Sequence, residues 1–375
     1  MAKRYEYDTS TDALLRPAKN AAYFDQWGPA DFENDDLLCA EMSRLAYSNQ
    51  EVVNSSLSAA GFSLVGFIGG EDPGSRAQTG GTQAFLAASE KRGVTIVAFR
   101  GTESDRPEDL IADLMTLPVP SASGKCRVHG GFKDRYDRVS DRLKSALAKR
   151  ERKLLVTGHS LGAALATLAA VDARPEKLIT FGSPLAGDSR FRELLQDTEI
   201  HRFVDCCDVV ARVPPARFDT QHLFQLLSEL TGFDSITGKT TTREKLAQKV
   251  GEEALKLASA AIAEAFHRVD PNIEFAHVSS PRYIRADGTI AGEINEDDIS
   301  SDQKAARAQY PHPLTGAEFH EILGESPKLA EISPDNIPRI VGQSLKHFFG
   351  IGQVPSRDLA DHAPINYVSA FTGRV

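Results

Sequence analysis

A strand, a tight turn and a helix follow one another directly between residues 154 and 171, and this segment constrains the fold more than any other. Residues 154–157 (Leu-Leu-Val-Thr) form a run typical of a buried strand. The Ala- and Leu-rich residues 161–171 predict a helix. Between them, residues 158–162 read Gly-His-Ser-Leu-Gly, a G-x-S-x-G pattern in the strand-to-helix context that it requires.

A turn this tight explains the two glycines of the pattern. We expect a side chain at Gly158 or Gly162 to collide with the neighbouring strand or helix. The backbone of Ser160 is expected to be strained, with its hydroxyl lifted above the sheet and facing the N-terminus of the helix. His159 neighbours the serine in sequence and is expected to point elsewhere, so we interpret it as a packing or tuning residue rather than as a base.

The surrounding sequence repeats the alternation of strands and helices. Further strands are predicted at residues 62–68, 94–99, 178–181, 202–205 and 275–284, and helices at 31–47 and 134–147. Such alternation predicts a mostly parallel sheet with helices on both faces. We therefore expect an α/β fold of the α/β-hydrolase type that spans residues 1–375 as a single domain, with a loose arm up to about Ala30.

The alternation stops after Pro214-Pro215. Residues 216–274 contain two predicted helices, at 221–230 and 243–266, and residues 297–352 are mostly helix and loop. We interpret both stretches as helical insertions that cap one end of the sheet.

Several separate motifs resemble the class 3 lipases, which are similar to fungal lipases. Besides the G-x-S-x-G turn, they appear in the family's order and cover roughly residues 60–215. They are Val97-Ala98-Phe99-Arg100-Gly101-Thr102, Val128-His129-Gly130-Gly131-Phe132, Thr180-Phe181-Gly182-Ser183-Pro184 and the run from Asp208 to Pro215.

The resemblance implies roles for individual residues. Ser160 would be the nucleophile and Asp208 the acid of a triad, while Thr102 and Leu161 would donate backbone N–H groups to an oxyanion hole. Residues 103–125 lie where the family carries its lid, but this segment has Leu110 and Ile111 where an aromatic residue is common.

The chemistry itself restricts the acid and the base. A serine nucleophile needs an imidazole within hydrogen-bond reach and a carboxylate to orient that imidazole, in the chain order Ser, acid, His. Asp208 follows a predicted strand and precedes a proline-rich turn, so it is favoured over its rival Asp205. His362 lies in a loop before a short apolar closing helix and is favoured as the base over His277, which lies in a predicted strand.

Composition excludes several other kinds of site and partner. The net charge of −9 argues against nucleic acid and anionic membranes as main partners. The histidines lack H-E-x-x-H spacing, and no Gly-rich dinucleotide motif follows a strand, so we expect no metal and no organic cofactor. The cysteines match no zinc motif and are expected to be free thiols; they are Cys39, Cys126, Cys206 and Cys207.

The N-terminus has no apolar run after Lys3-Arg4, and no stretch is long enough to span a bilayer. These features predict a cytoplasmic chain, or one secreted without a recognisable signal.

Together these features predict a serine hydrolase that cleaves carboxylic esters through an acyl-enzyme, with a triacylglycerol lipase as the leading hypothesis. A phospholipase A1 or a short-chain esterase would use the same triad. A catalytically idle, lipase-like interaction protein is the alternative of another class. The expected partner is a lipid or another ester, with a lipid–water interface as a candidate surface; the sequence leaves the oligomeric state open.

Overall fold

A computed structural model of the 375-residue chain defines the fold. It describes residues 5–19, 22–24, 34–69, 84–102, 114, 116–148, 152–230, 256, 259–260, 262–264, 266–268, 270–309 and 357–374.

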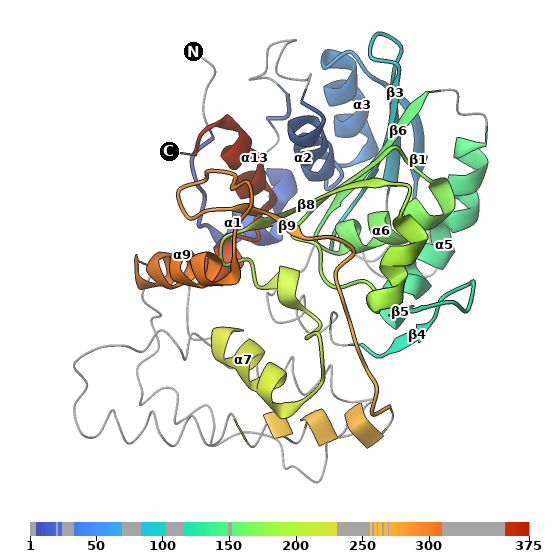
Figure 1. The fold of residues 1–375 in the computed structure, drawn as a ribbon. Helices are drawn as coiled ribbons and strands as arrows, with labels where there is room; N and C mark the ends of the chain where they lie inside the picture. The colour runs from blue at the N-terminus through green and yellow to red at the C-terminus, as the bar shows by residue number, and fades with distance from the viewer. Residues whose placement is uncertain are drawn as a thin grey trace.

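Within these residues, seven strands form one sheet in the order β1-β2-β3-β6-β7-β8-β9 (Figure 1). The pairs β1–β2 and β2–β3 are antiparallel, and every pair from β3 to β9 is parallel. A second, two-stranded sheet joins β4 (Pro118–Pro120) to β5 (Arg127–His129). The strands of the large sheet are Ser63–Ile68, Ala84–Ser89, Val94–Phe99, Lys153–His159, Lys177–Phe181, Glu199–Asp205 and Pro281–Ile284.

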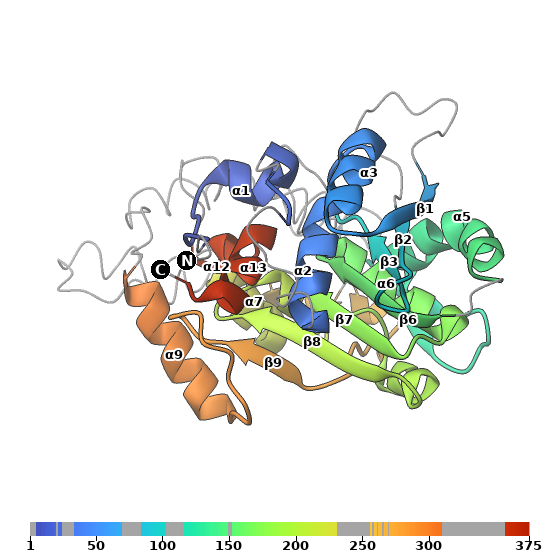
Figure 2. The same cartoon turned by 90° about the horizontal axis from the view of Figure 1, so that it is seen from above.

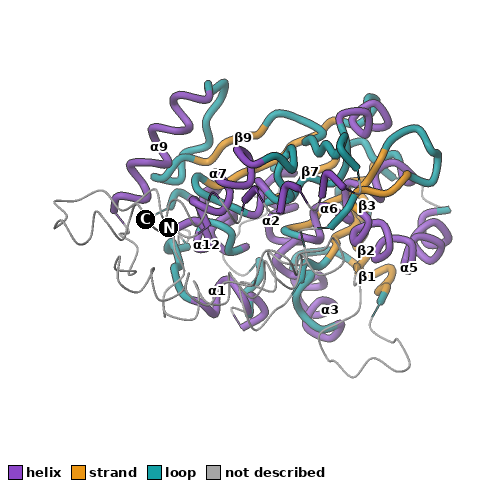
Figure 3. Tube along the Cα trace, turned by 90° about the horizontal axis from the view of Figure 1, so that it is seen from below, coloured by secondary structure: helices purple, strands orange, loops and turns teal. Residues whose placement is uncertain are grey.

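Helices cover both faces of this sheet (Figures 1 and 2), while the strands form one continuous layer between them (Figure 3). One face packs against α2 (Asp35–Leu45) and α13 (Pro364–Thr372), and the other against α6 (Leu161–Ala173), which α5 (Gly130–Leu147) covers in turn. This is the mostly parallel, two-sided architecture of an α/β-hydrolase, so the predicted fold class is confirmed.

The side chains of β3 show why its sequence is apolar throughout. Val97 and Phe99 belong to the hydrophobic cluster on the α6 side, whereas Ile96 and Ala98 belong to the cluster on the α2 side. Successive strand residues point to opposite faces, and here both faces are buried.

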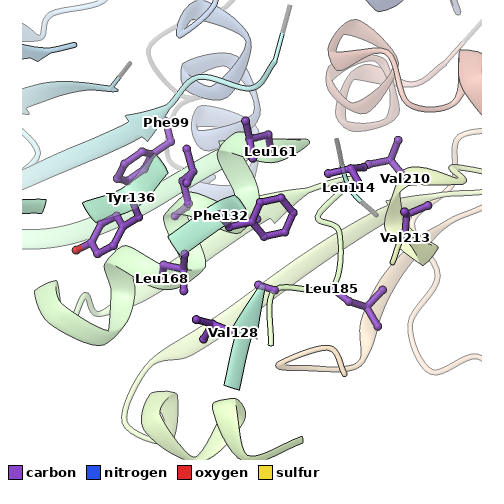
Figure 4. Packing of buried hydrophobic residues seen from close by; sticks show 14 of the residues in the cluster. Phe99, Leu114, Val128, Phe132, Tyr136, Leu161, Leu168, Leu185, Val210 and Val213 are labelled. Atoms are coloured by element: carbon purple, nitrogen blue, oxygen red, sulfur yellow. The ribbon is translucent and has the colours of Figure 1, made fainter. Parts of the chain in front are cut away.

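The cluster on the α6 side extends beyond the sheet. Figure 4 shows Leu161 and Phe132 on one side of it and Leu185, Val210 and Val213 on the other. The packing therefore joins the start of α6 to the chain segments that follow β7 and β8.

Several elements were not anticipated from the sequence. The arm predicted up to Ala30 is wrong for the part described, because α1 (Thr11–Leu15) buries Leu14 and Leu15 and contacts α12 (Arg357–Ala360) and α13. Strand β2 and helix α3 (Gln50–Ala59) were not predicted. The strand expected at 275–284 forms only at Pro281–Ile284, because Glu274 and Ala276 make isolated bridges outside the sheet.

The structure describes parts of the predicted insertions and lid. The first insertion contains α7 (Thr220–Leu230) and the second contains α9 (Glu296–Gln309), while residues 231–255 and 310–352 lie outside the described residues. Of the predicted lid, Leu114 and residues 116–125 are described, and the latter include β4. The domain and lid assignments stay predictions. None of the described helices combines the length and the apolar character that a membrane span needs.

His129 fixes the start of α5, which begins four residues before the predicted Asp134. Its Nδ1 accepts the backbone N–H of Phe132 at 3.2 Å and caps the helix, while its Nε2 donates to the carbonyl oxygen of Leu114 at 3.0 Å. Burial lowers the pKa of His129 to about 4, so the ring stays neutral and Nδ1 stays an acceptor at neutral pH.

This buried cap predicts a pH dependence of stability. An ordinary histidine has a pKa of 6.5, so between pH 6.5 and 4 the unfolded chain binds a proton that folded His129 does not. The contribution of His129 to the free energy of unfolding should therefore fall by about 3 kcal/mol as the pH is lowered through that window. In His129→Asn, which keeps a capping acceptor, this contribution should vanish. Urea titrations at a series of pH values test this, and parallel curves for the two proteins would contradict it.

Candidate active site

Ser160 lies at the junction of β6 and α6 in the conformation expected of a tight turn. Its φ of 59° and ψ of −130° place a non-glycine residue at positive φ, a strained conformation. The backbone N–H of Ser160 donates to the carbonyl oxygen of Phe181 in β7 at 3.0 Å, which ties the turn to the neighbouring strand.

The two glycines of the turn are required by close backbone contacts. A Cβ on Gly158 would lie 2.3 Å from the carbonyl oxygen of Gly162, and a Cβ on Gly162 would lie 2.3 Å from that of Phe99. No side chain fits at these distances, so α6 can cross β3 and β6 this closely only because both residues are glycine.

The structure brings Ser160, His362 and Asp208 together. The Nε2 atom of His362 lies 2.8 Å from Ser160 Oγ, and its Nδ1 atom lies 2.9 and 3.0 Å from the two carboxylate oxygens of Asp208. A carboxylate accepts hydrogen bonds, so His362 donates from Nδ1 to Asp208, and its Nε2 atom is directed at the serine hydroxyl. All three side chains are buried.

Different elements supply the three residues. Asp208 follows the carboxyl end of β8, as Ser160 follows that of β6, so the parallel strands deliver both to one edge of the sheet. His362 comes from the turn between α12 and α13.

Asp208 is held by two further donors. The backbone N–H of Val210 donates to Oδ1 at 2.9 Å, and the hydroxyl of Tyr367 donates to Oδ2 at 2.5 Å. Burial and the charge of Asp208 raise the pKa of Tyr367, so its hydroxyl remains a donor. Tyr367 was not predicted from the sequence, where its only signal was an aromatic residue five positions after His362 on the closing helix.

The two rival residues take other roles. Asp205 pairs through its carboxylate with Arg374, and its backbone N–H donates to the Tyr367 hydroxyl at 3.1 Å. His277 donates from Nε2 to the carbonyl oxygen of Ala211 at 2.7 Å and lines a cavity of about 260 Å³ beside α7. Burial lowers its pKa well below the usual value. Neither residue takes the place that Asp208 or His362 occupies next to Ser160.

The proposed oxyanion donors lie on either side of the serine turn. Leu161 is the first residue of α6, where backbone N–H groups have no acceptor within the helix. Thr102 follows Gly101 just after β3, and a Cβ on Gly101 would lie 2.8 Å from the carbonyl oxygen of His159. The segment that carries Thr102 therefore lies directly against the turn that carries Ser160.

One group of potential metal ligands occurs among the described residues. Cys206, Cys207 and Asp361 bring their ligand atoms within 4.8 Å of one another. The Asp361 carboxylate already accepts hydrogen bonds from Tyr7, Arg357 and the backbone N–H of Cys207. These contacts commit the carboxylate to the protein, so we assign no metal to this group. All four cysteines fall within the described residues, and all are buried free thiols.

The region that carries Ser160 and Asp208 matches a known protein family model. The family model described as Lipase (class 3) matches residues 96–218, which include Ser160 and Asp208 but end before His362. Over this region the chain is similar to the class 3 lipases.

Individual relatives match the same part of the chain. A lipase from Rhizomucor miehei is 35% identical over 159 residues, which cover 38% of this chain and 43% of the relative. Phospholipase A1-II 4 from Oryza sativa subsp. japonica is 35% identical over 173 residues, which cover 36% and 43%. The chain thus spans less than half the length of these curated relatives. A solved structure of Rhizomucor miehei triacylglyceride lipase aligns at 27% identity and a TM-score of 0.40, covering 49% of this chain and 76% of that one.

The site also requires glycine at position 182, where a side chain would not fit. It has a φ of +56°, and a Cβ there would lie 2.6 Å from Asp208 Oδ2 and 2.9 Å from His362 Nδ1. A side chain at this position would push against the contact between the carboxylate and the imidazole.

The variant Gly182→Ala should therefore disturb the site, in addition to the free-energy cost of an alanine at positive φ. Gly61→Ala is a matched control, because Gly61 has a φ of +77° with nothing within 4 Å of the added Cβ. In each variant, an alanine in the left-handed backbone conformation should lower the free energy of unfolding by about 1–2 kcal/mol. Only in Gly182→Ala should urea titrations show a further decrease in the free energy of unfolding. Only this variant should also react more slowly with a fluorophosphonate probe. Equal behaviour of the two variants would refute the steric argument.

Proposed function

We propose that this protein is a serine hydrolase that cleaves carboxylic esters of lipids, with Ser160 as the nucleophile, His362 as the base and Asp208 as the acid. The observation that carries the proposal is the continuous hydrogen-bonded path from Ser160 Oγ through the His362 ring to the Asp208 carboxylate. The same three residue types act in this arrangement in hydrolases of unrelated folds.

In the first half of the reaction, Ser160 Oγ attacks the ester carbonyl carbon while His362 Nε2 takes the hydroxyl proton. Asp208 stabilises the imidazolium that forms, and it is itself fixed by Val210 and Tyr367. The negative charge on the former carbonyl oxygen is stabilised by the backbone N–H groups of Leu161 and Thr102, together with the N-terminus of α6. His362 then protonates the leaving alcohol, which leaves an acyl group on Ser160.

In the second half, His362 takes a proton from water, which attacks the acyl-enzyme. The same oxyanion donors stabilise the second tetrahedral intermediate, and the proton returns to Ser160 Oγ as the carboxylic acid leaves. The chain's own residues supply every proton transfer, so the proposed mechanism uses no cofactor.

We propose triacylglycerols as the substrate class. The family match and the names of the relatives support lipid esters, and two of those names mark the alternatives, since they describe a triacylglyceride lipase and a phospholipase A1. Initial rates on tributyrin, trioctanoin, phosphatidylcholine and p-nitrophenyl acetate separate a lipase from a phospholipase and from a short-chain esterase. Higher kcat/KM on phosphatidylcholine than on trioctanoin would favour phospholipase A1.

The roles in the triad predict a graded set of losses. Ser160→Ala and His362→Ala should each lower kcat about 10⁶-fold, as in a comparable triad. Asp208→Asn should keep the shape of the site but favour the wrong imidazole tautomer, with a loss of about 10⁴. Hydrolysis of a p-nitrophenyl ester measures all three, with circular dichroism as the check on folding.

The assignment fails for any residue whose folded variant hydrolyses esters at a near-wild-type rate. Labelling of the wild type by a fluorophosphonate, lost in Ser160→Ala, distinguishes an enzyme from a catalytically idle interaction protein. Absence of labelling in the folded wild type would favour the idle protein.

A further inference from the structure

Tyr47 connects parts of the site that lie far apart in the sequence. It follows the end of α2, is buried, and places its hydroxyl 2.9 Å from Nδ1 of His159, the residue before Ser160. The other ring nitrogen of His159, Nε2, lies 2.7 Å from the backbone carbonyl oxygen of His362.

The direction of each hydrogen bond follows from the chemistry of its partners. A carbonyl oxygen only accepts, so His159 Nε2 must carry a proton and donate to His362. Burial lowers the pKa of His159 well below the usual value, so the ring is neutral and its Nδ1 is bare. The Tyr47 hydroxyl therefore donates to His159 Nδ1.

The oxygen of the same hydroxyl also contacts the segment that carries Thr102. Burial raises the pKa of Tyr47, so the hydroxyl keeps its proton. A Cβ on Gly101 would lie 2.0 Å from Tyr47 Oη, so the loop is in close contact with the hydroxyl.

We propose that Tyr47 is a positioning residue, which couples the loop of Gly101 and Thr102 to the base His362 through the ring of His159. The path runs from Gly101, which packs against the Tyr47 hydroxyl, to His159 Nδ1 through the hydrogen bond that this hydroxyl donates, and from His159 Nε2 to the His362 carbonyl. It fixes the loop with the oxyanion donor and the backbone of the base relative to each other and to the Ser160 turn. This inference rests on the proposed function.

A positioning role differs from a purely structural one in what each active molecule can do. A structural residue changes how many molecules fold, whereas a positioning residue changes the turnover of those that do. The loss of one oxyanion donor, or a misplacement of reacting groups by about 1 Å, lowers rates by about 10²-fold.

The test compares Tyr47→Phe with Tyr23→Phe. Tyr23 is a matched control, because it is also buried and its hydroxyl bonds to Ser48 Oγ at 2.8 Å, one residue from Tyr47 but outside the path. Active sites are titrated with a p-nitrophenyl alkylphosphonate, which releases one p-nitrophenolate for each serine that reacts. The kcat per titrated site and the KM are then measured on a p-nitrophenyl ester.

We expect Tyr47→Phe to lose about 10²-fold in kcat per titrated site with KM unchanged, and Tyr23→Phe to match the wild type in both. His159→Leu, which removes both the acceptor for Tyr47 and the donor to the His362 carbonyl, should show the same kind of loss and serves as the second variant if Tyr47→Phe does not fold. A kcat per titrated site equal to that of the wild type in either variant overturns the inference.

The result separates this inference from the proposed function. A wild type that neither reacts with the phosphonate nor hydrolyses the ester overturns the proposed function, and this inference with it. The other outcome is that the wild type and Tyr23→Phe react with the phosphonate and hydrolyse the ester, and that Tyr47→Phe has the same kcat per titrated site as the wild type. This outcome overturns only the role of Tyr47.

Discussion

The close approach of α6 to β3 and β6 is the contact on which the rest of the site depends. Gly158 and Gly162 allow backbone atoms to meet where any Cβ would lie 2.3 Å from a carbonyl oxygen. Ser160 is held between them at a φ of 59°, and the hydrogen bond of its N–H to Phe181 ties this strained turn to β7. The buried core around α6 supplies the free energy that maintains the strain.

Around this turn, the parallel strands support the site, and the C-terminal segment completes it. Asp208 follows β8 at the same edge, and Val210 and Tyr367 fix its carboxylate. Tyr367 lies on the helix that follows His362, so one short segment supplies both the imidazole and a donor that orients the carboxylate partner. The N-terminal segment contributes too, because Tyr7 donates to Asp361, the residue before His362, at 2.6 Å.

The sequence and the structure agree best where the pattern is local. The strand-turn-helix at residues 154–171, the apolar run of β3 and the helix after His362 all formed as predicted, because their hydrophobic patterns and glycines act within a few residues. Strand β2 was missed although it is buried, because Ala84–Ser89 is rich in alanine and contains no β-branched residue. The N-terminal segment was misread because its order comes from contacts with α12 and α13 rather than from its own sequence.

The sequence by itself determined the α/β architecture, the Ser160 turn and the short set of acids and histidines that could accompany it. Tertiary structure alone decided among them: His362 rather than His277 meets the serine, and Asp208 rather than Asp205 meets His362, across 154 residues of chain. It also revealed Tyr367 and Tyr47, which no motif marked. The reason is physical, since local pattern fixes which elements form, whereas the order of strands in the sheet fixes which distant side chains come within hydrogen-bond reach.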